Sequence, residues 1–328
     1  MRAKDLAIET LRAIAIILVV ALHITNDGPL DQARSFYDYF AYTFQNIRLP
    51  LFTVISGYLY GLRPAYSGGY STFVLGKIRR IIVPLVTVVT LEIVAKSFLP
   101  GVTEKASIDQ LFHAIVYPYE HFWFLQVIFL IFVFVGLLDK LHIINSFSIW
   151  AGVFISSCCI YVFYPFLDID LPIFSLGTTS YLLPFFFLGY GVARFGEDMF
   201  SDNRSYLWLA LFLISFLIQQ YVWFEGHAEF ASKRSFLGLI VSVAGCATLF
   251  IFRRPVMGLC TLGSFAFTIY LYQGFGSAIG RRVGSLFFES NPHMYFICVI
   301  AITLAFGVVV DVTVSKIPKV RKLMLGVR

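Results

Sequence analysis

Charge is scarce in this sequence, since Asp, Glu, Lys and Arg make up only 13% of its 328 residues. A soluble domain carries about 25% charged residues, and its polar surface covers the core. Apolar residues reach 59%, and the mean hydropathy is +0.81. This composition excludes a soluble enzyme. It also excludes a disordered chain, which has low hydrophobicity.

Cysteine is also scarce, and glycine and proline are not enriched, with 5 Cys, 24 Gly and 12 Pro in the chain. These values exclude a collagen-like chain and a disulfide-stapled domain. No cysteine has CxxC spacing or the Cys/His spacing of a metal site. The cysteines lie within apolar stretches, so we interpret them as small buried residues and expect no metal site. They are Cys158, Cys159, Cys246, Cys260 and Cys298.

Long apolar runs are abundant instead. About 20 apolar residues cross the hydrocarbon core of a bilayer, and by that measure the chain has ten spans. The expected spans are 6–26, 36–60, 81–99, 121–138, 147–165, 181–195, 206–224, 236–252, 262–280 and 294–315. A β-barrel would show alternating strands of about 10 residues. We therefore predict an all-α, polytopic membrane protein, with residues 1–328 forming a single domain. Its sixth span is expected to be short and to be tilted, broken or partly re-entrant.

Lys and Arg indicate the orientation of these spans, because cytoplasmic loops carry an excess of both residues. An even number of spans places both termini on one side. Most of the 25 Lys and Arg residues fall in loops on that side, so both termini are predicted to be cytoplasmic. The net charge of +6 is then mainly an orientation signal and does not indicate nucleic-acid binding.

Charged residues within a span cost free energy and usually face a cavity or a partner. The first span contains Arg12 and His23, and eleven steps of about 100° carry the helix roughly 20° past three full turns. The two side chains should share one face, about 16 Å apart along the axis. Arg12 could simply snorkel to the headgroups, and His23 could be a hydrogen-bonded packing residue. A cation and a titratable base at this separation also suit a long anionic ligand such as coenzyme A.

Two further polar groups flank the expected spans. Lys77, Arg79 and Arg80 precede the third span, where they form either an ordinary cytoplasmic anchor or a phosphate clamp. Glu120 and His121 open the fourth span on the outer side and form a candidate acid–base or sugar-binding group. Trp123, which follows them, is either an interfacial belt residue or a stacking platform for a sugar. His121 could equally be a solvated loop residue.

Other polar residues lie at helix depth. Ser56 and Gly57 allow close helix packing, although Ser56 is also a candidate for substrate contact. Tyr270 and Gln273 either line a cavity or hydrogen-bond between helices. Glu92 and Lys96, spaced i and i+4, are interpreted as a structural pair, with a role in a cavity left open.

Together these segments resemble the membrane acyltransferase-3 family of ten-helix O-acyltransferases. The resemblance is carried, in the family's order, by Arg12-x10-His23, PLFTVISGYLYG at 50–61, KIRRIIVP at 77–84, HFWFL at 121–125, PFFFLGYGVAR at 184–194 and LGSFAFTIYLYQ at 262–273. The chain departs from the family pattern at Lys77, where the family has arginine, and at Gln273, where it often has histidine. Lys77 cannot bind phosphate in the bidentate manner of arginine, and Gln273 cannot act as a base.

The resemblance implies transfer of an acyl group, usually acetyl, from cytoplasmic acyl-CoA to a hydroxyl of an extracytoplasmic or lipid-linked sugar. It implies donor contact for Arg12 and an essential catalytic role for His23. We expect Lys77, Arg79 and Arg80 to meet the donor phosphates and His23 to act as general base. Glu120 or His121 would orient His23 or the sugar.

Several roles and alternatives stay open. Ser56, Tyr270 or a backbone N–H would stabilise the oxyanion, and both direct transfer and an acyl-histidine intermediate fit the residues. The expected location is the bacterial inner membrane, with exopolysaccharide among the acceptor classes and a homo-oligomer compatible with the chain. A secondary transporter for sugars or lipid-linked saccharides is the main alternative, although the two related halves typical of such proteins are not visible. A non-catalytic assembly subunit is the third.

Overall fold

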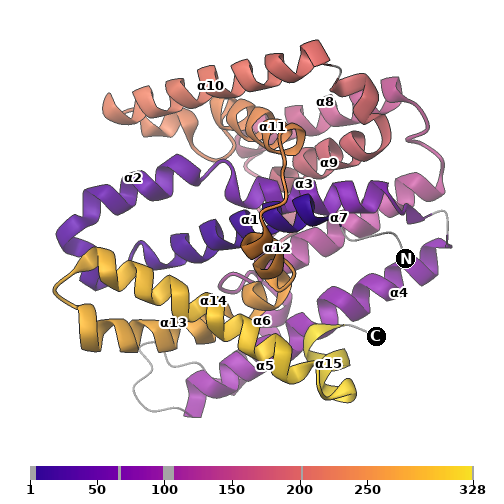
Figure 1. The fold of residues 1–328 in the computed structure, drawn as a ribbon. Helices are drawn as coiled ribbons and strands as arrows, with labels where there is room; N and C mark the ends of the chain where they lie inside the picture. Colours follow the sequence, from indigo (N-terminus) through magenta and orange to yellow (C-terminus); the bar gives the residue numbers. More distant parts are fainter. Residues whose placement is uncertain (1–4, 66–67, 99–106, 201, 327–328) are drawn as a thin grey trace.

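The computed structural model describes residues 5–65, 68–98, 107–200 and 202–326, and these residues form a helical bundle (Figure 1). Among them only helices and connecting turns occur. The α-helices are α1 (Leu6–Ile24), α2 (Arg34–Phe44), α3 (Arg48–Gly61), α4 (Tyr70–Lys77), α5 (Val83–Phe98), α6 (Leu111–Val116), α7 (Trp123–Lys140), α8 (Phe147–Phe163), α9 (Thr179–Met199), α10 (Asp202–Phe224), α11 (Phe236–Ile251), α12 (Met257–Gly263), α13 (Ala266–Phe288), α14 (Pro292–Val314) and α15 (Pro318–Leu325).

Short helical segments connect several of these helices. The 3-10 segments are η1 (Gly28–Ala33), η4 (Ile108–Gln110), η5 (Tyr164–Leu167), η6 (Ile173–Thr178) and η7 (Ala228–Ala231). The segment η3 (Ile78–Ile82) is π-helical and joins α4 to α5 in one continuous stretch.

Within the described residues, 7 stretches are long and apolar enough to cross a membrane. They are Leu6–Ile24, Tyr70–Phe98, Trp123–Lys140, Phe147–Leu167, Ile173–Gly196, Arg204–Phe224 and Pro292–Val314. These stretches confirm the predicted class, an all-helical chain with several membrane-spanning helices. The count of ten spans and the side that the termini face stay predictions.

The remaining three expected spans coincide with helices that are interrupted or short. Expected span 36–60 is divided into α2 and α3 by a turn at 45–47, and expected span 262–280 is divided between α12 and α13. Expected span 236–252 corresponds to α11, which has 16 residues. Interrupted helices inside a membrane domain usually lie against protein rather than lipid, because their freed backbone groups need partners.

Two expected spans have different boundaries in the structure. The third, expected at 81–99, begins earlier at Tyr70, and its last residue lies outside the described residues. The sixth is longer than the expected 181–195, because η6 precedes α9 and the stretch runs over Ile173–Gly196. Phe174 and Ser175 within η6 have φ of 51° and 54°, so the stretch is bent near its start.

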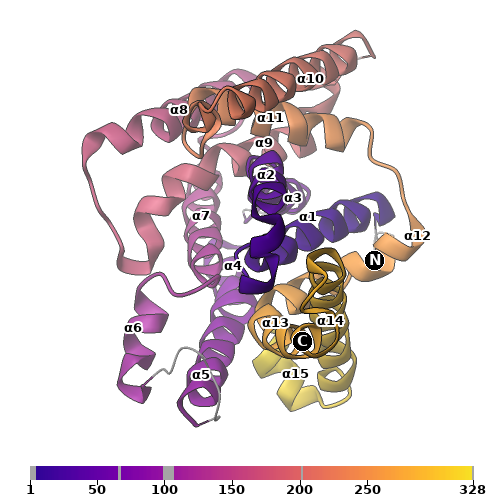
Figure 2. The ribbon, with the colours of Figure 1, turned by 90° about the vertical axis from the view of Figure 1, so that its left-hand side faces the viewer.

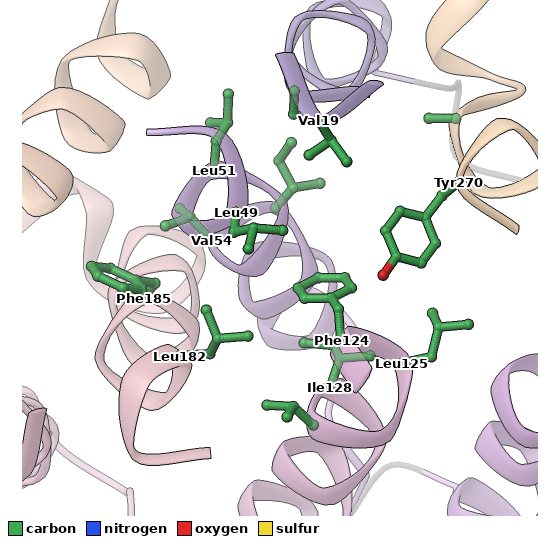
Figure 3. Close-up of a cluster of buried hydrophobic side chains, with 14 of the residues drawn as sticks. Val19, Leu49, Leu51, Val54, Phe124, Leu125, Ile128, Leu182, Phe185 and Tyr270 are labelled. Carbon is green, nitrogen blue, oxygen red and sulfur yellow. The ribbon is translucent and has the colours of Figure 1, made fainter. Parts of the chain in front are cut away.

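Helix α1 lies at the centre of the bundle, where it packs against α3, α12, α13 and α14. Figure 2 shows α1, α2 and α3 between an upper group with α8, α10 and α11 and a lower group with α13, α14 and α15. A buried apolar cluster joins α1, α3, α7, α9 and α13, and the labelled side chains of Figure 3 converge there. A residue on α1 is therefore held from several sides.

Helices α3 and α9 cross so closely that side chains are excluded at the crossing. A Cβ atom at Gly57 would lie 2.0 Å from the Phe186 carbonyl oxygen, and one at Gly189 would lie 1.9 Å from the Val54 carbonyl oxygen. The structure confirms that small residues in the 50–61 segment permit close packing.

Candidate active site

The predicted catalytic histidine of α1 faces the predicted histidine that precedes α7. The ring centroids of His23 and His121 are 6.1 Å apart, and the ring planes meet at 64°. His23 occupies the last turn of α1 and is exposed, whereas His121 is buried with 6% of its surface accessible. Two residues far apart in the sequence thus form one imidazole pair.

His121 is held in place by its neighbours. The Tyr270 hydroxyl donates a hydrogen bond to the His121 carbonyl oxygen, and the Phe122 ring lies 4.1 Å from the His121 ring. Burial, with a smaller contribution from His23, lowers the pKa of His121 to about 3, so this ring is neutral at physiological pH. Its Nε2 atom has no hydrogen-bond partner among the described residues. A neutral, fixed imidazole can donate or accept one hydrogen bond towards a bound substrate.

Glu120 lies beside the pair in a turn and has a φ of 46°. Its carboxylate accepts a hydrogen bond from Lys96 Nζ at 2.8 Å, and the same ammonium is 3.0 Å from Glu92 Oε1. The predicted pair of Glu92 and Lys96 is therefore present within α5. Lys96 also forms an ion pair with Glu120, which connects α5 to the turn before α7. The Glu120 charge also acts on His23, so this turn is positioned to influence the exposed imidazole.

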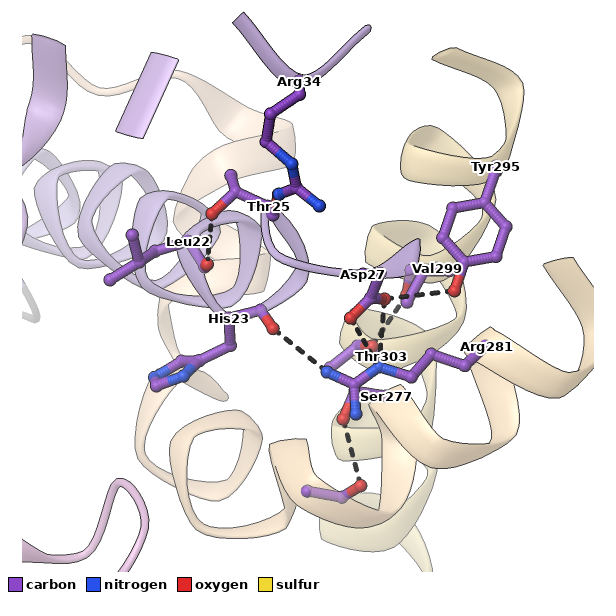
Figure 4. A network of polar contacts seen from close by, with 11 residues as sticks. Leu22, His23, Thr25, Asp27, Arg34, Ser277, Arg281, Tyr295, Val299 and Thr303 are labelled. Atoms are coloured by element: carbon purple, nitrogen blue, oxygen red, sulfur yellow. Dashed lines mark hydrogen bonds and ion pairs between the residues drawn. The ribbon is translucent and has the colours of Figure 1, made fainter. Parts of the chain in front are cut away.

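A polar clamp fixes the end of α1 that carries His23 (Figure 4). Arg281 Nη2 donates to the His23 carbonyl oxygen at 3.0 Å, and Arg281 Nε lies 3.0 Å from both carboxylate oxygens of Asp27. The Tyr295 hydroxyl donates to Asp27 at 3.1 Å, and Arg34 Nη1 donates to the Thr25 carbonyl oxygen at 2.7 Å. Arg281 and Arg34 thus satisfy backbone carbonyls left free at the C-terminus of the helix. The His23 ring points away from the clamp in Figure 4.

Arg12 lies in the other half of α1, and its guanidinium is engaged. Arg12 Nη1 is 3.0 Å from Glu9 Oε1, and Glu9 is buried with 4% of its surface accessible. The Arg12 side chain is 30% exposed. The guanidinium is thus paired with Glu9 one turn earlier in the helix, and part of it stays accessible. The predicted contact of Arg12 with the acyl donor stays a prediction.

The predicted phosphate clamp lies in and around the π-helical segment. Lys77 Nζ is 3.1 Å from the centroid of the Phe132 ring, so its ammonium packs on an aromatic face. Arg80 is exposed and Arg79 is half-buried, both within η3. The backbone of Arg79 and Arg80 also contacts Gly326 at the end of α15. Arg80 is thus the most accessible cation of the three for an anionic ligand.

The remaining predicted substrate residues have separate environments. Ser56 Oγ donates to the Phe52 carbonyl oxygen at 2.9 Å, which occupies its proton within α3. Trp123 is half-buried beside Phe124 at the start of α7. Gln273 is buried, and neither its amide nitrogen nor its amide oxygen has a partner among the described residues. Of this group, Tyr270 alone is tied by a hydrogen bond to the imidazole pair.

Sequence reasoning gave no site role to Arg281, Asp27, Arg48 and Lys233. Arg48 was visible as a charged residue within an expected span, which is the signal that singled out Arg12. Arg281, Asp27 and Lys233 looked like ordinary outer-loop residues, because the sequence does not show which loop charges fold back over the end of α1. The described residues include no group of three or more His, Cys, Asp or Glu side chains that could hold a metal ion.

The fold and this site together define a multi-pass membrane protein whose central helix presents an accessible histidine to a second, buried one. The family model described as an acyltransferase domain matches residues 5–312 of the chain. The protein therefore belongs to the acyltransferase-3 family, as predicted, and is an acyltransferase by family. Searches of curated proteins and of solved structures found no match to the chain.

Proposed function

We propose that the protein is an O-acyltransferase that moves a short acyl group, most simply acetyl, from cytoplasmic acyl-CoA to a sugar hydroxyl. The acceptor is an extracytoplasmic or lipid-linked saccharide, such as an exopolysaccharide unit, and the location is the bacterial inner membrane. The observation that carries this proposal is the accessible His23 ring facing the His121 ring at 6.1 Å, in a chain of the acyltransferase-3 family.

In the proposed reaction His23 takes the proton from the acceptor hydroxyl. The hydroxyl oxygen then forms a bond to the acyl carbon, the carbon–sulfur bond of the thioester breaks, and the CoA sulfur leaves and is protonated. A neutral imidazole near pH 7 suits this role of general base. The neutral His121 would hold the acceptor or the ring of His23, and the clamp on α1 keeps His23 in position.

Donor binding in this proposal uses the cations that are predicted to lie on the cytoplasmic side. The phosphates of acyl-CoA would meet Arg80 and Arg79, with Lys77 beside them, and the arm of the donor would run along α1 past Arg12. About 16 Å separate Arg12 from His23 along the helix axis at 1.5 Å per residue. That length suits a pantetheine arm between phosphates and thioester. Trp123 would stack on the acceptor sugar, and Gln273 would donate or accept a hydrogen bond.

The test is acyl transfer by the detergent-purified protein. We expect free CoA thiol from acetyl-CoA in the presence of a sugar acceptor, together with a product heavier by one acetyl group. Uptake of a sugar or lipid-linked saccharide into vesicles without thiol release would instead support the secondary transporter. Comparison of surface glycans from cells with and without the protein, by mass spectrometry, would identify the acyl group and the acceptor together.

A further inference from the structure

Two cations near His23, Arg48 and Lys233, take no part in the reaction as proposed above. The charged groups that act on His23 are the cations Arg48, Arg281 and Lys233 and one carboxylate, Glu120. Arg281 is paired with Asp27, and Glu120 is paired with Lys96. Arg48 and Lys233 are therefore the two cations near His23 that form no ion pair among the described residues.

Arg48 is the more unusual of the two, because a buried arginine normally has an acidic partner. It is 4% exposed, and its Nη1 donates to the Ala41 carbonyl oxygen at 3.2 Å. Its Nε has no partner among the described residues. Within the described part of the chain, no carboxylate is among the groups that act on its charge. The guanidinium thus has unused donor capacity and an uncompensated charge.

Lys233 is brought towards Arg48 by a well-anchored loop. The Ala231 carbonyl oxygen accepts hydrogen bonds from Asn46 Nδ2 at 2.7 Å and from Gln45 Nε2 at 3.1 Å. These two amides lie in the break between α2 and α3, next to Arg48. On the other side of Lys233, the backbone N–H of Arg234 donates to the Tyr161 hydroxyl at 3.0 Å.

The two cations repel each other in the absence of a ligand. Lys233 is exposed, yet the surrounding protein desolvates its ammonium and lowers its pKa, and the Arg48 charge lowers it further. Two like charges held together without an acid are unfavourable by themselves. The arrangement becomes favourable when an anion binds between the two cations, because charge-assisted hydrogen bonds are stronger than hydrogen bonds between neutral groups.

The geometry points to a binding site for an anionic oxygen group of the substrate, a carboxylate or a phosphate, held by Arg48 and Lys233 beside His23. This inference rests on the proposed function, because it treats the ligand as part of a substrate of the His23 reaction. The anion has two chemical sources. It is either a phosphate or carboxylate on the acceptor saccharide, or the distal carboxylate of a dicarboxylic acyl group such as succinyl.

Anion binding is tested first without any acyl transfer. The purified protein is titrated with inorganic phosphate and with succinate, against chloride at matched ionic strength, and thermal unfolding is followed. A ligand that binds only the folded protein raises Tm in a saturable manner. We expect such a rise with at least one of the two anions in the wild type and its loss in Arg48→Gln. The matched control is Arg282→Gln, which removes an exposed outer arginine and should keep the rise.

The same experiment separates ligand binding from a structural role of Arg48. Without added anion, Arg48→Gln should unfold at the wild-type Tm or above it, because the change removes one of two like charges. A Tm several degrees lower, or an undiminished response to the anion, would overturn the inference. Absence of a saturable rise with both anions in the wild type would overturn it as well.

The source of the anion is identified by comparing KM values for matched anionic and neutral substrates. Arg48→Gln should raise KM about tenfold for succinyl-CoA but not acetyl-CoA if the acyl group carries the anion. If the acceptor carries the anion, Arg48→Gln should raise KM about tenfold for glucose 1-phosphate but not for methyl glucoside. An equal loss with neutral and anionic substrates contradicts the inference. If the wild type transfers no acyl group to any acceptor, the proposed function fails, while the anion-dependent Tm still decides whether this site exists.

Discussion

His23 combines two properties that rarely occur together in a membrane helix. It lies in the last turn of a central helix that is packed against four others, and yet it is exposed. Polar side chains at such positions are expensive unless they serve a site. The second imidazole and the carboxylate of Glu120 lie on the same side of the molecule as the ring. The proposed chemistry therefore belongs to the end of α1 that carries His23, which is predicted to face outwards.

Replacement of His23 by alanine tests the general base directly. We expect His23→Ala to lose acyl transfer by at least about 100-fold, which is the usual contribution of a general base. Membrane insertion and Tm should be unchanged. His227→Ala is the matched control, because His227 is exposed and far along the chain in an outer turn. Full acyl transfer by His23→Ala would refute the assignment.

The proposed donor contact of Arg12 is tested by two variants, one that removes its charge and one that removes only its ion-pair partner Glu9. Arg12→Ala should raise KM for acyl-CoA about tenfold, because one charge-assisted contact to the donor is lost. Glu9→Gln removes the partner and keeps the cation, so KM should change little. If both variants behave as the wild type in steady-state kinetics, Arg12 is a snorkelling residue paired with Glu9.

At the scale of elements, the end of α1 is held by residues of α2, α13 and α14 in addition to its own cap at Thr25. Arg281 of α13 caps the His23 carbonyl and pairs with Asp27, which Tyr295 of α14 also contacts. This arrangement explains how a residue in the last turn of a helix, where helices commonly fray, keeps a defined position.

Arg281 is therefore predicted to be a positioning residue. Arg281→Gln should lower kcat about tenfold with little change in KM for acyl-CoA, because the donor contacts lie elsewhere and only the base is displaced. Arg281→Lys should recover part of kcat, since the ammonium can still meet Asp27. A fall in Tm that accompanies an unchanged kcat would show that the clamp serves stability alone.

The crossing of α3 and α9 gives a prediction about stability. Gly189→Ala should destabilise the protein by about 1–3 kcal/mol, the usual cost of overpacking, because its Cβ would overlap the backbone of α3. Gly152→Ala is the matched control in α8, since no atom lies within 4 Å of a Cβ there, and its Tm should not fall. Equal Tm values for the two variants in thermal unfolding would contradict this packing.

At the scale of the whole molecule, the first turn of α1 and the helix α15 lie towards the same end of the bundle (Figure 1). This arrangement agrees with an even number of crossings, and the excess of Lys and Arg predicts that this end faces the cytoplasm. A fluorescent protein fused after the last residue should fluoresce in cells, and alkaline phosphatase at the same position should be inactive. The opposite pattern would invert the topology and place His23 at the cytoplasmic surface.

The sequence predicted much of this architecture because apolar runs of about 20 residues are a direct consequence of bilayer thickness. It did not predict the interruption between α2 and α3 or the division of α12 from α13, since only residues 45–47 and 264–265 separate these helices, too few to end an apolar run. It also underestimated the stretch that includes η6 and α9. Local bends depend on backbone partners that come from other helices.

For the site, the sequence by itself singled out the residues within or beside the expected spans that we propose for the chemistry, namely Arg12, His23, Glu120 and His121. Charged and titratable groups are so costly there that their presence is informative on its own. Only the tertiary structure decided that His23 and His121 face each other and that Arg281 and Asp27 clamp α1. It also decided that Arg48 and Lys233 lie in one region, where neither forms an ion pair among the described residues. Pairing between distant segments depends on packing, which leaves no local signal in the chain.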